Sequence, residues 1–356
     1  MINLAKLEYR VHVILRGGSQ LDVTNLTTGL GFSEGEKNLS LKIQLKLANA
    51  EYKGGTLFEQ IQPLTPVFIY SNPSGEFEEV ARGNVAKIKF VESNGDLYLD
   101  LETNDEAHAL RENQDNFYFT DGHSSSSILE EILNKHGVPH EIQIQDATHS
   151  KKVYRKKYLS DSIADVLKDL KEKGGGVYFV RAKEGVVQII PRGTNETVWH
   201  FDLDNSLIKV QESFDASKVV TRVQVVGKEK TEAHPRIEST IDGKTQYGTR
   251  QVIYERGNKE TAGEAETAAK KILEEQGDIK RQTTIDAPDV PTLRKGDRIR
   301  IRSSTGTGYF FVKQINHNAV TQRMTCELDE DKDTNSAQGL SYDTSHSNEY
   351  NSSSPP

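Results

Sequence analysis

The chain has a single cysteine, Cys326, among its 356 residues. One thiol cannot form an internal disulfide, so the sequence suits a protein assembled in a reducing cytoplasm. No stretch approaches the roughly 18 consecutive apolar residues that a membrane-spanning helix needs. The N-terminus alternates apolar and charged residues, where a signal peptide would have a continuous apolar core. The sequence therefore predicts neither a membrane anchor nor a secretory leader.

The chain has fewer basic than acidic residues. Lys and Arg number 45 against 53 Asp and Glu, which gives a formal net charge of -8. An acidic chain is poorly suited to general nucleic-acid binding or to docking on an anionic membrane. The composition is otherwise that of a soluble chain, with 35% hydrophobic and 28% charged residues. Its length allows about two to four domains.

Sequence motifs that carry chemistry are also scarce. The glycine-rich runs 174–176 and 306–308 lack the strand–loop–helix order and the Lys-Ser/Thr pair of a phosphate-binding loop. Residues 122–124 (Gly-His-Ser) lack the G-x-S-x-G pattern of a nucleophile elbow. His136 and His140 have a metal-site spacing, but the Gly and Pro between them disfavour a helix. We therefore predict no catalytic residue, no metal site and no cofactor. A hydrolase with paired carboxylates stays open, because 53 acidic residues offer many pairs.

The chain divides by pattern into β-rich and mixed segments. Residues 1–105 are predicted to be all-β, and strand 39–47 alternates apolar and polar residues without interruption. Residues 115–193 predict an α+β domain with two helices, and the glycines at 174–176 end the second. A second barrel is expected from 200–230 and 280–330, with a polar and helical insertion at 232–279. Residues 333–356, rich in Ser and Asn, are expected to form a flexible tail.

Two stretches of the chain share one plan. Residues 63–102 and 291–328 each open with a turn and an alternating strand, continue through a glycine-containing loop and a strand, and close with a third strand. This order predicts an antiparallel meander in both places and indicates an internal duplication. The predicted fold class is α+β and mostly β, with two antiparallel β-barrels and small α+β domains inserted between and within them.

The second of these stretches concentrates positive charge on one strand of an acidic protein. The basic residues are Arg294, Lys295, Arg298, Arg300 and Arg302. One interpretation is a solvated strand face that protects a sheet edge. The other is an electrostatic contact with an acidic subunit or partner, and the sequence leaves both open.

A further set of residues is expected to have a structural role at the turns of the barrels. These residues are Gly83, Gly296, Asp297, Gly308 and His317. Glycine supplies the unusual backbone angles of tight turns, and an Asp side chain can cap its own turn. We interpret His317 as a turn histidine with a satisfied hydrogen bond.

The order of these motifs resembles the phage late control protein D family, the tail hub proteins of contractile phages. The motifs are Leu293-x-x-Gly296-Asp297-x-Ile299, Gly308-Tyr309 followed by Ile315-x-His317, Thr325-x-x-Leu328, and towards the front Leu21 to Thr24, strand 39–47, Arg82 to Val85 and Leu97 to Glu102. The resemblance is strongest to the XkdQ/YqbQ-type hub of Bacillus prophages and phage-tail-like particles. It covers most of residues 1–330.

The resemblance implies a structural hub and no catalysis. In the family, two tail-tube-like barrels per chain let a homotrimer form a pseudo-hexameric ring that joins the tail tube to the central spike and the baseplate. The implied partners are the tail tube protein, the central spike protein and other tail-tip proteins. DNA or tape-measure protein would pass through the channel without specific binding. The implied location is a virion or phage-tail-like particle assembled in the bacterial cytoplasm.

Two other functions stay open. A tail-associated cell-wall hydrolase would need a cleft with two carboxylates at hydrolytic spacing. A carbohydrate-binding β-protein would need an exposed aromatic platform, which only Trp199 and a few tyrosines could supply.

Overall fold

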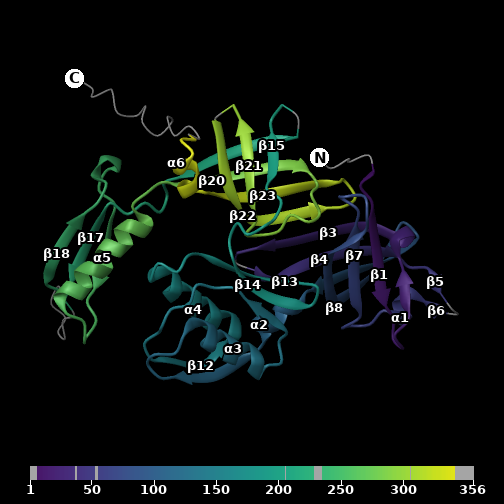
Figure 1. Cartoon of the computed structure of the whole chain (residues 1–356), viewed down its shortest axis with the longest axis horizontal. Coiled ribbons are helices and arrows are strands. Elements are labelled where there is room, and N and C mark those ends of the chain that lie inside the picture. Colours follow the sequence, from purple (N-terminus) through teal and green to yellow (C-terminus); the bar gives the residue numbers. More distant parts are fainter. Residues whose placement is uncertain are drawn as a thin grey trace. The chain divides into compact units, whose positions relative to one another are not determined.

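The computed structural model describes residues 6–36, 38–52, 55–204, 206–227, 235–304 and 306–340. The chain forms two compact units (Figure 1). The larger unit comprises Met1–Val210 and Thr284–Pro356, and the smaller comprises Gln211–Thr283. The protein is mostly β with small helical elements. Among the described residues, no helix has the length and apolar character needed to cross a membrane.

The first β module opens the larger unit. Its elements are β1 (Tyr9–Ile14), β2 (Gln20–Asp22), η2 (Thr24–Leu26), β3 (Thr27–Gly35), β4 (Asn38–Ala48), β5 (Glu51–Tyr52), β6 (Gly55–Thr56), α1 (Leu57–Gln60), β7 (Pro66–Ser71), β8 (Glu78–Ser93) and β9 (Asp96–Asn104). On β4 the alternate residues Leu41, Ile43, Leu45 and Leu47 are all buried in the module's core, so the strand predicted at 39–47 is confirmed.

An α+β domain follows within the same unit. Its elements are η3 (Glu106–His108), α2 (Ala109–Glu112), β10 (Gln114–Phe119), α3 (Ser125–Lys135), β11 (His140–Ile142), β12 (Lys152–Tyr158), α4 (Leu159–Glu172), β13 (Tyr178–Lys183) and β14 (Val186–Pro191). The Ser124 side chain caps α3 by accepting a hydrogen bond from the Ser127 amide. After α4, Gly174 has a φ of 80°, a conformation that ends a helix at low cost only with glycine. Both predicted helices are confirmed.

The second β module completes the larger unit. Its elements are β15 (Trp199–Asp202), β16 (Lys209–Asp215), β20 (Lys280–Pro288), β21 (Arg298–Ser303), β22 (Gly306–Asn318), β23 (Arg323–Glu330) and α6 (Lys332–Ala337). Residues 211–215 of β16 and 280–283 of β20 fall within the segment of the smaller unit. Helix α6 corrects part of the predicted tail, because Asp331 caps it and the buried Asn335 anchors it to Tyr309. Residues 341–356 of that tail lie outside the described residues.

The smaller unit contains β17 (Arg222–Val226), β18 (Ile237–Asp242), η4 (Thr245–Tyr247), β19 (Gln251–Glu255) and α5 (Ala262–Gln276). The residue pattern of segment 200–230 predicts β17 as part of the second barrel. In the structure, β17 is instead the central strand of a three-stranded sheet with β18 and β19. Its buried Val223 and Val225 pack against Ala265 and Ala269 of α5. The strand therefore belongs to the small unit, where it completes an independent core.

The two β modules have the same strand topology. In space the first runs β1-β7-β8-β9-β4-β3, and the second runs β15-β21-β22-β23-β20-β16. If the short strands β2, β5 and β6 of the first module are left out of the count, both orders read first, fourth, fifth, sixth, third, second along the chain. They differ in the first strand, which is antiparallel to its neighbour in the first module and parallel in the second. The internal repeat that the sequence indicated is thus present in the topology.

The repeat extends to the irregularities of the long strands. Strand β8 shifts register against β9 between Val85 and Lys87. Strand β22 shifts register against β23 between Val312 and Gln314. A β-bulge locally changes twist and side-chain direction, so its recurrence at one place is a specific match.

The turn in front of each meander also repeats. Leu64 in the first module and Gly296 in the second both have a positive φ, 71° and 86°. Each donates its amide hydrogen, at 2.7 Å, to the carbonyl of the valine before the bulge, Val85 or Val312. Leu64 of the first module therefore corresponds to Gly296 of the second, and Val85 corresponds to Val312. By the same alignment, the part of β8 after its bulge corresponds to the end of β22.

The correspondence explains where the small unit enters the chain. In the first module, β3 and β4 are joined directly by a short connection. The corresponding strands β16 and β20 are separated by the rest of Gln211–Thr283. The small unit is thus an insertion at the tip of a hairpin, a position where added residues leave the module's ladder intact.

Candidate functional site: the junction of the two β modules

The two β modules are joined edge to edge by their strands. The end of β22 pairs antiparallel with β3, from Gln314 opposite Gly35 to Asn318 opposite Gly31. At this junction the ring of His317 stacks on Phe32, with ring centroids 4.2 Å apart. This pairing makes one continuous sheet of 13 strands from the two modules.

His317 lies in strand β22 and is buried, so its predicted place in a turn is wrong. Its hydrogen bonds are satisfied, as predicted. Nδ1 lies 2.6 Å from Oδ1 of Asp289, and Nε2 lies 3.1 Å from the carbonyl oxygen of Leu293. Asp289 also accepts a hydrogen bond from the Tyr9 hydroxyl of β1. The histidine therefore links both modules through polar contacts as well as through its ring.

A buried ion pair lies beside this strand pairing. Arg294, in the turn before β21, donates from Nε and Nη2 to the two carboxylate oxygens of Glu34 in β3, at 2.6 and 2.8 Å. The Lys295 amide donates to the same carboxylate at 2.8 Å, and its Nζ donates to the carbonyl of Leu39 at 2.8 Å. The Lys295 side chain is among the largest fully buried ones in the chain, at 1% exposed.

The same turn also holds the α+β domain. Asp297 accepts a hydrogen bond from Nη1 of Arg181, on β13, at 2.8 Å. Gly296 packs so closely against Phe179 that an added Cβ would lie 2.8 Å from the ring. Its φ of 86° favours glycine as well. The predicted structural role of Gly296 and Asp297 in this turn agrees with these contacts.

Asp105 completes the cluster from the end of β9. Its Oδ2 accepts a hydrogen bond from the Leu41 amide at 3.0 Å, and its Oδ1 accepts one from the Ala107 amide at 3.1 Å. The carboxyl thus caps η3 and holds β4 at once. Both of its oxygens are engaged by backbone amides.

Burial and neighbouring charges set the ionisation of the cluster. Burial alone would raise the pKa of Glu34, but Arg294 and Lys295 outweigh it and lower that pKa to about 2. Burial raises the pKa of Asp105 to about 7 and lowers the pKa of Lys295 to about 8. Burial also raises the pKa of Asp297. The Glu34–Arg294 pair therefore stays charged over a wide pH range, whereas Asp105 titrates near neutrality.

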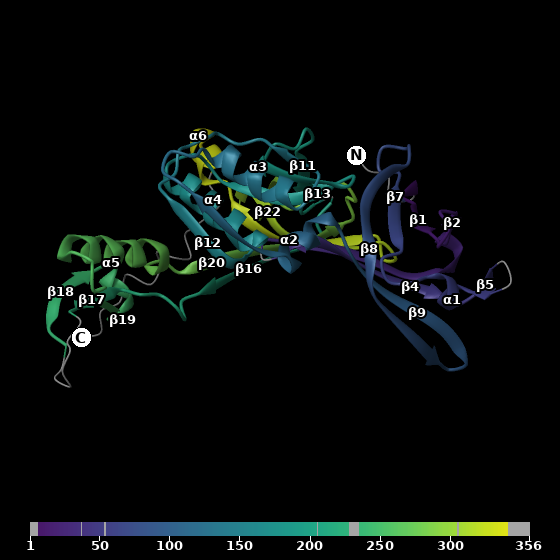
Figure 2. The ribbon, with the colours of Figure 1, turned by 90° about the horizontal axis from the view of Figure 1, so that it is seen from below.

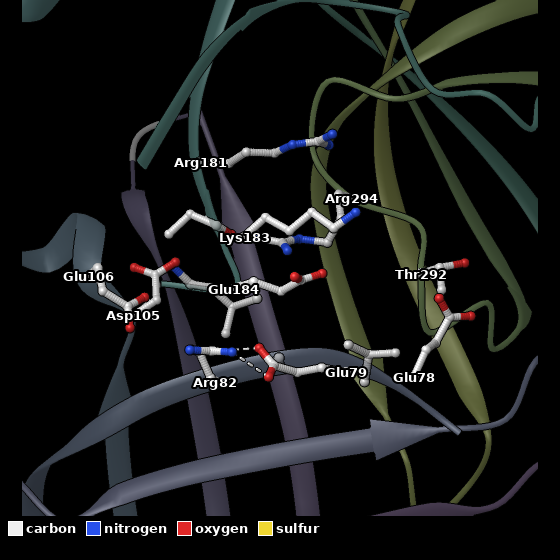
Figure 3. Close-up of a pocket in the computed structure, with 14 residues that line it drawn as sticks. Glu78, Glu79, Arg82, Asp105, Glu106, Arg181, Lys183, Glu184, Thr292 and Arg294 are labelled. Carbon is white, nitrogen blue, oxygen red and sulfur yellow. Dashed lines mark hydrogen bonds and ion pairs between the residues drawn. The ribbon is translucent and has the colours of Figure 1, made fainter. Parts of the chain in front are cut away.

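A cavity of about 140 Å³ lies next to the cluster and is lined by both β modules and β13 (Figure 3). Across it, Arg82 of β8 forms a two-point ion pair with Glu79, at 2.5 and 2.6 Å. Both oxygens of Glu79 and both oxygens of Asp105 are thus engaged in contacts within the protein. Among the described residues, no group of three or more His, Cys, Asp and Glu side chains could hold a metal ion. The geometry of this site is that of a joint between domains.

The predicted partner contact does not fit Arg294 and Lys295. Both side chains point into the molecule and bind residues of the first module. Arg298 lies 2.9 Å from the carboxylate of Asp331, so part of its charge is also neutralised internally. The correction has a physical cause: a buried acid from the distant strand β3 draws the basic turn inward.

From Arg298 onward, strand β21 shows the predicted alternation of basic and apolar residues. Ile299 and Ile301 are buried in the core of the second module, and Arg300 and Arg302, which alternate with them, face outward. Arg300 lies over the ring of Tyr309, and Arg302 is 62% exposed beside Asp202 and Asp204. A partner contact through Arg300 and Arg302 stays a prediction.

Two glycines expected in turns lie within strands. Gly308 is in β22 opposite Ile301, after the turn. Gly83 is in β8, where an added Cβ would lie 2.6 Å from the carbonyl oxygen of Asn104 on β9. Gly83 is therefore needed for the close approach of two backbones, which is a different reason from the one predicted.

Sequence reasoning missed Glu34, Asp105 and Arg181. Glu34 lies on a strand whose local pattern does not mark a buried acid, and its partner Arg294 is 260 residues away. Asp105 carried a usable signal, since an Asp before a short helical segment is a typical N-cap. Arg181 is an ordinary strand residue until the turn at 294–297 is brought against it.

A family model described as YQBQ-like matches residues 76–329. This chain belongs to the YQBQ-like family. The resemblance to YqbQ-type proteins that the sequence motifs predicted is thereby confirmed. No curated protein matches the sequence.

Several proteins of known structure share the fold at low sequence identity. The 43 kDa tail protein of prophage MuSo2 from Shewanella oneidensis is 11% identical, with 91% of this chain and 98% of that one covered and a TM-score of 0.68. The tail protein from Neisseria meningitidis MC58 is 11% identical, with 91% and 97% covered and a TM-score of 0.64. The E. coli c3393 protein is 10% identical, with 91% and 76% covered and a TM-score of 0.51. It is described as a type VI secretion component similar to the T4 tail proteins gp27 and gp5.

Proposed function

We propose that this YQBQ-like protein is the structural hub of a contractile phage tail or phage-tail-like particle. As a homotrimer it would form a pseudo-hexameric ring that joins the tail tube to the central spike and the baseplate. The observation that carries the proposal is a fold shared with prophage tail proteins over nearly their whole length, in a chain of the YQBQ-like family.

The internal repeat supports the ring. Two modules of one topology lie edge to edge in each chain. Three chains would then supply six similar modules, which matches a sixfold tube on one side and a threefold spike on the other. The buried Glu34–Arg294 pair and the stacked His317 fix the two modules of one chain as neighbours. A rigid pair is what such a ring needs as its repeating element.

The proposed partners follow from this place in the particle. They are the tail tube protein, the central spike protein and other baseplate and tail-tip proteins. The net charge of -8 would limit adhesion of DNA passing through the channel, because like charges repel. Assembly would occur in the bacterial cytoplasm.

The proposed role includes no catalysis. The buried carboxylates of the junction are held by an arginine or by backbone amides, which suits a joint. For the alternative, a tail-associated cell-wall hydrolase, Asp105 is the candidate acid, because its pKa is raised to about 7 beside a cavity, and a second carboxylate of that cavity would have to act with it. A cell-wall suspension that is cleared by the protein, but not by Asp105→Asn, would favour the hydrolase.

The solution mass tests the hub. One chain has a mass of 39.8 kDa, so three chains give about 119 kDa. We expect light scattering to show this mass at high protein concentration and a shift toward one chain on dilution. A mass that corresponds to one chain at every concentration would contradict the ring.

A further inference from the structure

The internal repeat leaves one strand edge without a partner. In the second module, the end of β22 pairs with β23 on one side and with β3 on the other. In the first module, residues 87–93 of β8 correspond to that segment and pair with β9 on one side. Strand β7 pairs with β8 only up to Asn84. In the described part of the chain, no strand pairs with the other edge of residues 87–93.

We call the unpaired edge of β8 at residues 87–93 the open edge. An aromatic side chain is exposed beside it, whereas the side chain at the corresponding position of β22 is buried. Phe90 corresponds to His317, counted from the bulge, and His317 is covered by Phe32 of β3. Phe90 is 45% exposed and contacts Phe58, which is also exposed. Figure 2 shows β8 and β9 extending as a long hairpin at this end of the module. Exposed aromatic residues on an unpaired strand are a typical interaction surface.

The turn beside the open edge is also exposed, whereas the corresponding turn of the second module is buried. Leu64 corresponds to Gly296, which is enclosed by Phe179 in the closed junction. Leu64 is 76% exposed, although its φ of 71° is unfavourable for a leucine. An exposed leucine held at a strained backbone position is a feature that a stable monomer alone does not need.

The complementary strand is also present in the chain. Strand β16 has the position in the second module that β3 has in the first, and among the described residues it is the last strand at that end of the sheet. Its Phe214 is 52% exposed. Because β3 pairs with β22 within the chain, its counterpart β16 is suited to pair with the counterpart of β22, which is β8.

We propose that the open edge of β8 at residues 87–93, together with Leu64, receives β16 of a second copy of this chain. The contact repeats between chains the pairing of β22 with β3 within a chain. This inference rests on the proposed ring of three chains, and it identifies the surface through which neighbouring chains would close that ring. The two surfaces differ, so the contact is head-to-tail, and three copies close a ring of six modules.

The two kinds of junction differ in chemistry. Arg294 and Lys295, which form the buried ionic contacts within the chain, correspond to Gln62 and Pro63 in the first module. The contact between chains therefore relies on strand hydrogen bonds and apolar contacts.

Two variants and a matched control test the surface in the full-length protein. Leu64→Asp and Phe90→Asp each place a charge on the proposed contact. Tyr118→Asp changes another exposed aromatic residue, which lies in the α+β domain. We expect the first two to weaken assembly at least about tenfold in light scattering, as loss of a central apolar contact does. The control should assemble like the parent.

Hydrogen exchange gives an independent readout that does not depend on variants. Neighbouring amides of a strand point to opposite edges, so roughly half of those at 87–93 face the open edge. We expect deuterium uptake in this segment to fall as the parent protein assembles on concentration. Circular dichroism of each variant checks that its fold is retained.

The outcomes separate this inference from the proposed hub. A trimeric parent whose two variants are monomeric, with protection of residues 87–93 on assembly, supports both. A trimeric parent whose folded variants also form trimers, without protection of this segment, overturns the inference and leaves the hub standing. A parent that never assembles overturns the hub and the inference together.

Discussion

Replacing Arg294 with methionine removes the cation that neutralises Glu34 at the junction of the two β modules. Methionine has a similar reach and no charge, so the change leaves most of the packing in place. Glu34 is 3% exposed, and its carboxylate would lose both charge-assisted hydrogen bonds from the guanidinium. We expect a marked loss of stability, because an unpaired charge would remain in a site closed to water.

The size of the expected loss in stability can be worked out from the ionisation of Glu34. Its pKa is lowered from 4.5 to about 2 by Arg294 and Lys295 against the opposing effect of burial. At 1.36 kcal/mol per pKa unit, this corresponds to roughly 3 kcal/mol of favourable interaction. Loss of one partner of a buried ion pair costs about 3–5 kcal/mol in other proteins. The pKa route includes the contribution of Lys295 and the opposing effect of burial, so it gives only the order of magnitude. We therefore expect Arg294→Met to cost about 3–5 kcal/mol.

Denaturant unfolding followed by tryptophan fluorescence measures this loss. Trp199 is the only tryptophan of the chain and lies on β15, in the second module. Arg302→Met is the matched control. Arg302 lies on β21, the strand that follows the turn of Arg294, and its side chain is 62% exposed. Its ion pairs with Asp202 and Asp204 are at the surface, so we expect the control to cost less than about 1 kcal/mol.

A double-mutant cycle refines the test. Glu34→Gln combined with Arg294→Met removes both charges, so the double variant should lose less than the sum of the single losses. We expect a coupling energy of about 2–3 kcal/mol. Additive losses, or a loss below about 1 kcal/mol for Arg294→Met alone, would refute the view that this pair holds the modules together.

Two further predictions concern the first module. Gly83→Ala should cost about 1–3 kcal/mol, since its Cβ would lie 2.6 Å from the Asn104 carbonyl oxygen. Gly263→Ala, with open space around it in α5, should be neutral or stabilising when both variants are compared by denaturant unfolding. Because burial raises the pKa of Asp105 from 3.8 to about 7, the folded state binds this proton more tightly, and stability should fall as pH rises from about 4 to 7. Asp105→Asn should flatten that fall, and an unchanged pH profile would contradict it.

Local periodicity was enough to predict the individual elements of this protein. The alternation of strand 39–47 and the helical spacing of α3 and α4 each depend on residues close in sequence. The shared plan of the two meanders also came from local patterns, since turns and strand lengths repeat in order. These features are decided by which face of each element is apolar, and that is written in consecutive residues.

The positions of the functional contacts were not predictable in this way. Arg294 and Lys295 have the sequence signature of an exposed basic patch, yet both are buried. Their direction is decided by Glu34, whose distance along the chain is 260 residues, and by the pairing of β22 with β3. No local pattern records such a pair.

The sequence by itself thus determined the β-rich character, the helices of the α+β domain and the existence of two similar meanders. The tertiary structure decided that these modules share one sheet, that β17 belongs to a separate unit, and that His317 and the basic turn lie inside. The physical reason is the range of the forces involved. Hydrophobic periodicity acts within an element, whereas burial of a charge depends on a partner that only the folded chain brings near.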